Sequence, residues 1–405
     1  MRSQAARLDE AAGLAAAIGI DVVERRAFRI RMARPATLFG KGQVEEIAGN
    51  ARDAEAGLLI VDASLTPVQQ KSLEQMAKVK VIDRTGLILE IFGERAVTAE
   101  GRLQVELAHL DYQAGRLVRS WTHLERQRGG FGFLGGPGET QIEADRRLIR
   151  DRMARIRKEL DQVKRTRGLH RDRRQRAPWP VVALVGYTNA GKSTLFNRMT
   201  RAKVMAEDLL FATLDPTMRE VRLPGHDKAI LSDTVGFVSD LPTELVAAFR
   251  ATLEEVASAD LILHVRDLAH PDSDAQAADV AQVLASLGLD QPDSPPRLEV
   301  WNKLDRITGD DRVALDNEAR RRGTGEVVPI SALTGEGVDA LRDAISRRLA
   351  EGSTIHQLKL DSADGSRLAW LHARGKVLDR RADGQRLYLS VRLSPENWAR
   401  YQALG

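Results

Sequence analysis

Apolar residues change their spacing several times along the chain, and these changes divide it into segments. Residues 27–95 alternate short apolar runs, typical of strands, with apolar residues at helical spacing. Strands are predicted at Leu58–Val61 and Val79–Ile82, and helices at Val44–Ala51 and Thr66–Ala77. We therefore expect an α/β domain over residues 1–100, without a glycine-rich phosphate loop of its own.

After residue 100, two segments carry apolar residues at alternating spacings of four and three, the a/d pattern of a coiled coil. The first set is Leu103, Leu107, Leu110, Ala114, Leu117, Trp121 and Leu124, and the second is Ile149, Met153, Ile156, Leu160 and Val163. A single loop joins them, which predicts an antiparallel helical hairpin with facing apolar seams and a basic connector, within residues 101–178. Its tip, residues 126–140, holds six glycines together with Phe131, Phe133 and Leu134.

Strand-like runs alternate with helices again over residues 179–350, which predicts a doubly wound, mostly parallel sheet. The last segment, residues 351–405, has strand-like runs at Ile355–Leu360 and Arg386–Val391. A helix is predicted between them at Ser366–Val377, giving a small appended α/β unit. The fold class expected for the whole chain is therefore multidomain α/β.

One loop of the 179–350 segment has the pattern of a phosphate-binding loop. The apolar run Val181–Val185 leads into Gly186-Tyr187-Thr188-Asn189-Ala190-Gly191-Lys192-Ser193-Thr194, and a helical pattern follows. Glycine-rich backbone and a helix N-terminus can surround a β-phosphate with N–H groups. Lys192 can reach the β- and γ-phosphates, and the Ser193 hydroxyl can bind Mg²⁺. An ordinary glycine turn is the alternative, and it does not explain Gly-Lys-Ser between a strand and a helix.

Two later motifs predict that the base is guanine. Asn302-Lys303-Leu304-Asp305 follows a predicted strand, and the Asp305 carboxylate can accept two hydrogen bonds from the N1–H and N2–H₂ edge of guanine. Against adenine a buried carboxylate would stay unpaired, at a cost of about 1–3 kcal/mol or more. We expect Asn302 to tie this loop to the phosphate loop. Ser331-Ala332 follows the strand-like Val327–Ile330, and the Ala332 N–H is expected to donate to guanine O6.

Between these motifs lie two candidate switch segments. In Asp233-Thr234-Val235-Gly236, the aspartate is expected to hold Mg²⁺ through water and the glycine N–H to meet the γ-phosphate. Upstream, Phe211-Ala212-Thr213-Leu214-Asp215-Pro216-Thr217 offers two threonines as a further metal ligand, and spacing alone does not choose between them.

The residue after Gly236 is Phe237, where Ras-like proteins carry a glutamine that orients water. A phenyl ring can neither accept a proton nor orient water by hydrogen bonding. The hydrolytic apparatus is therefore incomplete, uses backbone groups or is completed by a partner. Of these we favour slow intrinsic hydrolysis that a partner accelerates in trans.

The 405-residue chain has a net charge of +4 and no cysteine, which excludes disulfides and fits a cytoplasmic protein. We expect neither a signal peptide nor a membrane span. Residues 145–176 hold twelve Arg and two Lys against five acidic residues, a net charge of +9. This local excess, dominated by arginine, favours RNA binding over the alternative of a solvated helix face.

Several further segments resemble the HflX GTPases, translation-factor-like proteins of the TRAFAC class, over nearly the whole chain. They are Leu38–Gly42, Val81–Gly86, Gln104–Ala108, Gly136–Gln141 with Glu143–Arg147, and Leu210–Thr217. The resemblance implies that Thr213 is the switch threonine on Mg²⁺, together with Ser193 and Asp233. Lys192, Thr213 and Gly236 are then the residues expected to act in GTP hydrolysis.

The resemblance also implies that the partner is the large ribosomal subunit and its rRNA, with the hairpin loop reaching toward the peptidyl transferase centre. The implied activity is the splitting or rescue of stalled ribosomes, especially under heat stress, by a monomer that binds GTP and GDP. A GTP-gated RNA chaperone that assembles or checks the large subunit is the alternative. A signalling GTPase that uses the coiled coil to bind protein alone fits the arginine-rich hairpin less well.

Overall fold

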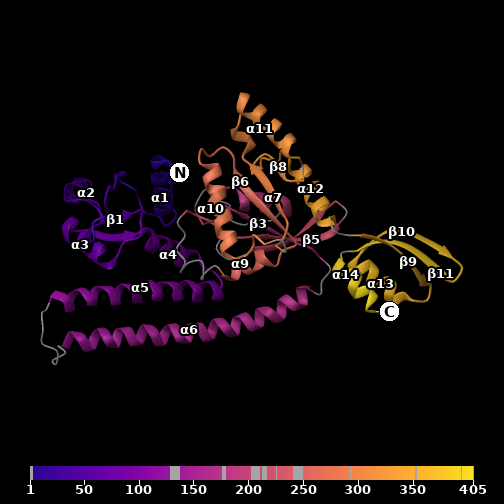
Figure 1. Ribbon diagram of the computed structural model, residues 1–405, viewed down its shortest axis with the longest axis horizontal. Helices are drawn as coiled ribbons and strands as arrows, with labels where there is room; N and C mark the ends of the chain where they lie inside the picture. The colour runs from indigo at the N-terminus through magenta and orange to yellow at the C-terminus, as the bar shows by residue number, and fades with distance from the viewer. Residues whose placement is uncertain are drawn as a thin grey trace.

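The computed structural model describes residues 3–127, 137–175, 179–201, 210–211, 217–224, 226–239, 250–291, 294–323, 325–351, 354–393 and 395–404. Figure 1 shows an N-terminal α/β domain, a long helical pair, a central domain on a six-stranded sheet and a small C-terminal sheet domain. This arrangement confirms the predicted multidomain α/β fold class. None of the helices within these described ranges is long and apolar enough to cross a membrane.

The N-terminal domain is a two-stranded parallel sheet flanked by helices. Its elements are α1 (Gln4–Ala16), α2 (Lys41–Asp53), β1 (Leu58–Val61), α3 (Pro67–Ala77), β2 (Lys80–Asp83) and α4 (Arg84–Arg95). A reciprocal cap begins α3, because the Thr66 hydroxyl accepts from the Gln69 N–H while the Gln69 side chain accepts from the Thr66 N–H. The two predicted strands and two predicted helices are confirmed with small shifts of their ends, and α1 and α4 complete the domain.

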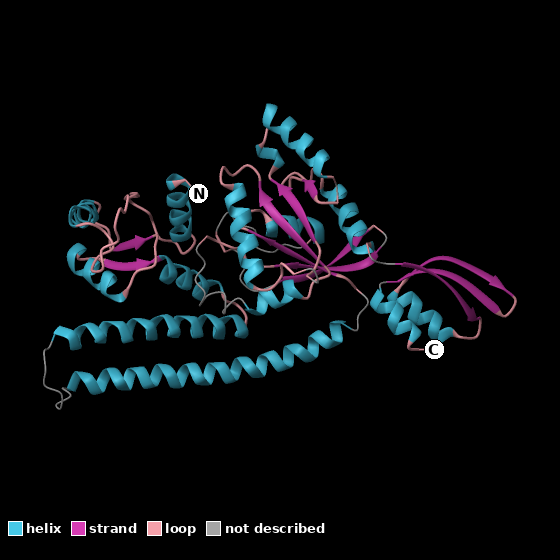
Figure 2. Ribbon diagram, viewed as in Figure 1, coloured by secondary structure: helices cyan, strands magenta, loops and turns pink. Residues whose placement is uncertain are grey.

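The predicted helical pair is formed by α5 (Ala99–Gln127) and α6 (Pro137–Gln175), which run antiparallel side by side (Figure 2). On α6 the seam residues Met153, Ile156 and Leu160 are buried. Beside them the Arg152 guanidinium donates to both carboxylate oxygens of Glu106 on α5, at 2.6 and 2.8 Å. The heptad pattern thus identified the buried face of α6, whereas the predicted seam residues Leu103, Leu107 and Leu110 on α5 are half-buried.

The first half of α5 also packs against the N-terminal domain and is hydrogen-bonded to it. Asp83, the N-cap of α4, accepts hydrogen bonds from the Tyr112 hydroxyl at 2.6 Å and from Arg116 at 2.7 Å. Val105 and Ala108 lie in the apolar core that α5 shares with α4. The side chains of the predicted seam residues Leu117, Trp121 and Leu124, and the tip loop at residues 128–136, lie outside the described part of the structure.

The central domain has a six-stranded sheet in the order β4-β5-β3-β6-β7-β8, in which only β4 is antiparallel to its neighbour. Helices cover both faces of the sheet (Figure 2). The strands are β3 (Val181–Gly186), β4 (Thr217–Leu223), β5 (His226–Asp233), β6 (Leu261–Asp267), β7 (Arg297–Asn302) and β8 (Val327–Pro329). The helices are α7 (Lys192–Thr200), α9 (Arg250–Ala257), α10 (Ser273–Ser286), the short η1 (Leu304–Arg306), α11 (Gly309–Arg322) and α12 (Val338–Ala350). Because β3 is central and covered on both faces, its sequence is continuously apolar.

The C-terminal domain is a three-stranded antiparallel sheet in the order β10-β11-β9, with two helices. Its elements are β9 (Thr354–Asp361), α13 (Gly365–Arg374), β10 (Lys376–Asp383), β11 (Arg386–Leu393) and α14 (Pro395–Gln402). The prediction of a helix as far as Val377 is wrong at its end, because that residue pairs with Val391 in the edge strand β10. The strand β10 was not predicted because its sequence is rich in charged residues and lacks an apolar strand pattern. Pairing with β11, rather than burial of an apolar face, stabilises this strand.

Candidate functional site

The glycine loop lies at the edge of the central sheet where the parallel strands end. It leaves β3 at Gly186 and enters α7 at Lys192. Gly191 has a φ of 92°, and a Cβ built on it would lie 2.2 Å from the side-chain nitrogen of Asn302. A Cβ on Gly186 would lie 2.2 Å from the Val265 carbonyl oxygen. Only glycine fits at these two positions, because neighbouring protein atoms already occupy the space that a Cβ would take.

Lys192 lies buried at the start of α7 with its ammonium group inside the loop. Its Nζ donates to the carbonyl oxygens of Tyr187 at 2.8 Å and of Gly186 at 3.1 Å. Burial lowers the pKa of Lys192 to about 8, and the nearby Asp233 carboxylate only partly opposes this effect. An anionic phosphate in the loop would supply the negative charge that this buried ammonium lacks.

The side chains of Ser193 and Asp233 lie together close to Lys192. The Ser193 hydroxyl donates to Asp233 Oδ2 at 2.7 Å, and Asp233 is fully buried at the end of β5. One hydroxyl and one carboxylate fit Mg²⁺, which binds few protein oxygens and takes its other ligands from phosphates and water. Among the described residues, no group of three or more His, Asp or Glu side chains forms a metal site by itself.

Asn302 connects the loop after β7 to the two loops beside it. Its side-chain nitrogen donates to the Ala190 carbonyl at 2.7 Å, as the sequence predicted, and its side-chain oxygen accepts from the Ala332 N–H at 2.9 Å. The Ala332 N–H, predicted to donate to guanine O6, therefore has a partner within the protein. A base at this position would have to share or replace that bond.

The Asp305 carboxylate is fixed by a hydrogen bond but is not buried. Its Oδ1 accepts from the Ser331 hydroxyl at 2.5 Å, and the residue is otherwise exposed to solvent. The expectation of a buried carboxylate thus differs from the structure, in which a bound base would have to cover it. Lys303 at the base of the same turn pairs with Asp267 at 2.8 Å, which joins the ends of β6 and β7.

The segment Asp233–Ser239, which we call switch II, lies directly against the phosphate loop. The Thr188 N–H donates to the Phe237 carbonyl at 2.7 Å, and the Phe237 N–H donates to the Gly186 carbonyl at 3.1 Å. The Phe237 ring is 2% exposed and packs in a core shared by the central domain and α4. The ring therefore has a structural place at the domain boundary and offers the phosphate side no polar group.

The second candidate switch segment lies mostly outside the described residues. Ala212, Thr213, Leu214 and Asp215 are among these undescribed positions, so the metal-ligand assignment of Thr213 stays a prediction. Phe211 is described: its ring packs edge-on against Phe92 of α4, with centroids 4.8 Å apart. Both candidate switch segments thus contact the N-terminal domain at one end.

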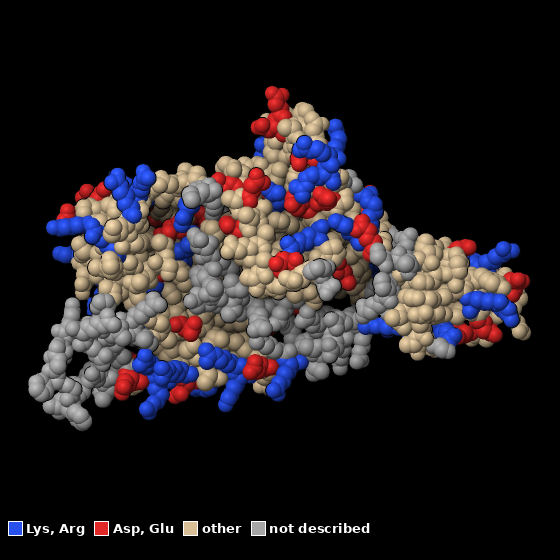
Figure 3. Space-filling view, viewed as in Figure 1, with Lys and Arg blue, Asp and Glu red and all other residues tan. Residues whose placement is uncertain are grey.

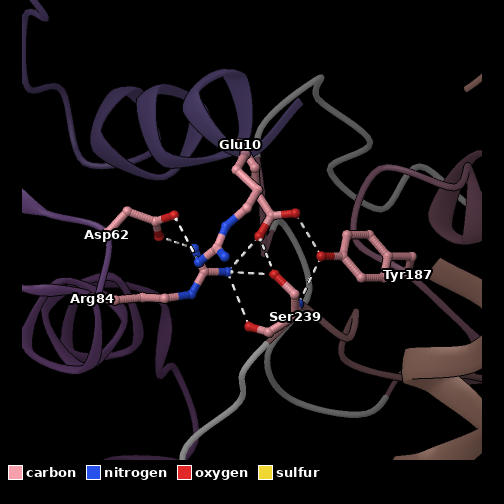
Figure 4. A network of polar contacts seen from close by, with 6 residues as sticks. Glu10, Asp62, Arg84, Tyr187 and Ser239 are labelled. Atoms are coloured by element: carbon pink, nitrogen blue, oxygen red, sulfur yellow. Dashed lines mark hydrogen bonds and ion pairs between the residues drawn. The ribbon is translucent and has the colours of Figure 1, made fainter. Parts of the chain in front are cut away.

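The side chain of Tyr187 has a role that the motif did not predict. Figure 4 shows its hydroxyl among Glu10 of α1, Arg84 of α4 and Ser239 of switch II. The motif predicts Tyr187 only as one of the loop residues around the phosphates. The sequence did offer one signal for a side-chain role: Tyr187 is a large ring with a polar end in a loop that carries mostly smaller side chains.

The outer face of α6 carries the basic side chains that the charge pattern predicted (Figure 3). Arg147, Arg150, Arg155 and Arg157 are exposed, and Arg146 is half-buried. Acidic residues are interleaved with them, so residues 145–163 carry a net charge of only +3, while residues 164–176 carry +6. Most of the positive charge therefore lies at the end of α6 that leads into the central domain.

Comparison with protein-family models finds four consecutive matches. Residues 5–93 match the GTP-binding GTPase N-terminal family and residues 95–174 the GTP-binding GTPase middle region. Residues 181–303 match a 50S ribosome-binding GTPase, and residues 316–402 match the HflX C-terminal domain.

Several curated relatives named GTPase HflX match nearly the whole chain. The protein from Magnetococcus marinus is 50% identical over 395 residues, covering 98% of this chain and 90% of its own. That from Escherichia coli is 43% identical over 397 residues, covering 97% and 91%. A solved GTP-binding protein from Sulfolobus solfataricus in complex with GDP is 24% identical, covers 85% of this chain and 95% of that chain, and has a TM-score of 0.45.

Proposed function

This chain belongs to the HflX family of GTPases, and from that membership we propose that it binds the large ribosomal subunit and separates or rescues stalled ribosomes. The observation that carries the proposal is the combination of a guanine-nucleotide motif set with an exposed basic helical face in one chain. The first supplies a GTP hydrolase, and the second supplies a surface for rRNA. The setting proposed is the cytoplasm under stress such as heat, with the protein acting as a monomer.

The nucleotide is proposed to bind along the carboxyl edge of the central sheet. The residues assigned to it are Gly186–Thr194, Phe211–Asp215, Asp233–Gly236, Asn302–Asp305 and Ser331–Ala332. Lys192, Thr213 and Gly236 are assigned to hydrolysis itself. Lys192 supports this assignment best, because it is a buried cation whose present partners are two loop carbonyls. A phosphate would neutralise it more fully.

Ser193, Thr213 and Asp233 are proposed to hold Mg²⁺. The 2.7 Å contact between the Ser193 hydroxyl and Asp233 supports two of these ligands, since it brings a hydroxyl and a carboxylate oxygen together at the start of α7. Mg²⁺, when bound, neutralises charge that develops on the phosphates. The loop carbonyls of Gly186 and Tyr187 hold the Lys192 ammonium group inside the loop.

Hydrolysis is proposed to be completed by the ribosome. Phe237 occupies the position after Gly236 and its ring is buried between domains, so it supplies neither a base nor a hydrogen bond to water. Slow intrinsic turnover follows, because a nucleophilic water in such sites needs a polar group to orient it. A group from the large subunit or its rRNA would supply what this chain lacks.

The four-part division into residues 1–100, 101–178, 179–350 and 351–405 is proposed to separate these tasks. The hairpin carries the arginine face and, at its tip, the glycine- and phenylalanine-containing loop proposed to enter folded rRNA. The nucleotide bound in the central domain is proposed to control the binding of the hairpin to rRNA.

Sedimentation of intact ribosomes tests the proposal. With this protein and GTP, the fraction of free subunits should rise, and it should stay unchanged with the Lys192→Ala variant. If the protein binds large subunits but leaves intact ribosomes whole under all nucleotide conditions, splitting is wrong and an assembly or chaperone role on the free subunit is favoured.

A further inference from the structure

A buried polar cluster joins three parts of the molecule that are far apart in sequence (Figure 4). Tyr187 lies at its centre, with 4% of its surface exposed. Its hydroxyl accepts a hydrogen bond from the Ser239 N–H at 2.7 Å and donates to Glu10 Oε2 at 2.5 Å. Its backbone carbonyl accepts from Lys192 Nζ at 2.8 Å. One residue of the phosphate loop therefore contacts α1, switch II and the phosphate-binding lysine.

Arg84, at the start of α4, holds the cluster from the side of the N-terminal domain. It pairs with Glu10 and, at 2.5 Å, with Asp62, and it donates to the Ser239 carbonyl at 3.0 Å and hydroxyl at 3.2 Å. The side chains of Arg84 and Glu10 are only 5% and 6% exposed. At this depth the charges are fixed in one geometry, because any departure leaves one of them buried without its partner.

The cluster is not needed merely to hold the two domains together. Apolar contacts already join them, through Phe92 and Phe211 at 4.8 Å and through Phe237 and Val238 in the shared core. Such burial is non-directional, whereas the hydrogen bonds to Ser239 set the position of one backbone segment. The distinct contribution of the cluster is therefore the placement of switch II.

The position in which the cluster holds switch II leaves no room for a third phosphate. A Cβ built on Gly236 would lie 2.8 Å from Thr188 Cα and 3.0 Å from Lys192 Nζ. The Thr188 N–H is also taken by the Phe237 carbonyl at 2.7 Å. A γ-phosphate has to lie between the lysine and the switch glycine. The β-phosphate needs only the loop N–H groups and the lysine.

We propose that Tyr187, set by Glu10 and Arg84 of the N-terminal domain, is a positioning residue that biases the site toward GDP by holding switch II on the phosphate loop. GTP binds only by moving Gly236 away, which strains or breaks the bond between the Tyr187 hydroxyl and Ser239. GDP binds with that bond intact. The inference rests on the proposed nucleotide site and is independent of ribosome splitting.

The test compares Tyr187→Phe with Tyr112→Phe in the full chain. The Tyr112 hydroxyl also donates to a buried carboxylate, at 2.6 Å from Asp83, but within the described part of the chain this hydrogen bond joins α5 to the N-cap of α4 and not to the phosphate loop. Dissociation constants of Mg-GDP and of a non-hydrolysable Mg-GTP analogue are measured by equilibrium titration. Tyr187→Phe keeps the ring and should raise affinity for the analogue relative to GDP by about three- to tenfold, the size of one hydrogen bond.

Tyr112→Phe should leave this affinity ratio as in the parent. An unchanged ratio in Tyr187→Phe, or equal shifts in both variants, overturns the inference. If the parent protein binds neither nucleotide, the proposed site itself is wrong.

A second comparison tests whether Glu10 acts through the tyrosine. Glu10→Gln and Tyr187→Phe, singly and together, form a double-mutant cycle on the same affinity ratio. Because both remove the same restraint, the double variant should change the ratio little more than Tyr187→Phe does. Additive changes would show that Glu10 does not act through Tyr187. They would overturn the inference that the N-terminal domain positions the Tyr187 side chain.

Discussion

Replacing Asn302 removes the link between the base-side loop and the phosphate loop. The side chain is 2% exposed and makes two hydrogen bonds, at 2.7 Å to the Ala190 carbonyl and at 2.9 Å to the Ala332 N–H. In Asn302→Ala both backbone groups lose this partner in a buried setting. We therefore expect the central domain to be destabilised even before nucleotide is added.

The expected magnitude follows from the two orphaned groups. A buried donor or acceptor left without its partner costs about 1–3 kcal/mol, so the upper range is about 2–6 kcal/mol for the pair. Water entering the vacated space recovers part of this, which gives an expected loss of about 2–4 kcal/mol. Such a loss increases the population of locally open states by roughly 30- to 700-fold.

The Asn302→Asp variant distinguishes the contribution of the hydrogen bond to the Ala190 carbonyl from that of the bond to the Ala332 N–H. It keeps an acceptor for the Ala332 N–H but places a carboxylate oxygen against the Ala190 carbonyl, so it should destabilise at least as much as alanine. Asn317→Ala on the exposed face of α11 is the matched control and should change stability by less than about 0.5 kcal/mol.

Hydrogen exchange of peptides covering β3 and β7 measures the opening of these strands directly, since the chain has several domains and no single unfolding transition. If Asn302→Asp exchanges like the parent protein in both strands, the hydrogen bond from Asn302 to the phosphate loop does not stabilise the central domain.

Three further predictions concern the base, the hairpin face and its tip. Asp305→Asn replaces an acceptor with a donor and should move preference from GTP toward xanthosine triphosphate; unchanged GTP affinity in an equilibrium titration would contradict the base assignment. Neutralising Arg146, Arg147, Arg150 and Arg157 should flatten the salt dependence of large-subunit binding, by up to about 0.7–0.9 in log–log slope per lost phosphate contact, and an unchanged slope would exclude these contacts. Replacing Gly129–Gly138 by a short Gly-Ser turn should abolish ribosome splitting while GTP binding and part of the subunit binding persist; splitting at the parental rate would make this loop a simple connector.

The sequence predicted the elements whose pattern follows directly from burial. The continuously apolar β3 and the heptad of α6 are examples, because a strand covered on both faces and a helical seam each require one spacing. The phosphate loop and the Asn302 contact to Ala190 also followed from motif order, since each motif ends a parallel strand of one sheet.

Contacts between domains could not be predicted in this way. Nothing in the local sequence around Glu10 or Arg84 indicates that they meet Tyr187, which lies 177 residues from Glu10. Such pairs depend on how two folded domains pack, and they follow no period. The exposure of Asp305 and the engagement of the Ala332 N–H were missed for a related reason: the motif describes a site with its base bound, and in the structure side chains of the protein fill those hydrogen bonds.

Single-turnover GTP hydrolysis, measured with and without purified large ribosomal subunits, shows whether the ribosome completes this site. Because Phe237 is buried and gives no polar group to the phosphate side, the rate should be low alone and should rise by at least about tenfold with saturating subunits. Lys192→Ala should remove the reaction in both settings. Equal rates of the parent protein with and without subunits would show that the ribosome supplies no group for hydrolysis.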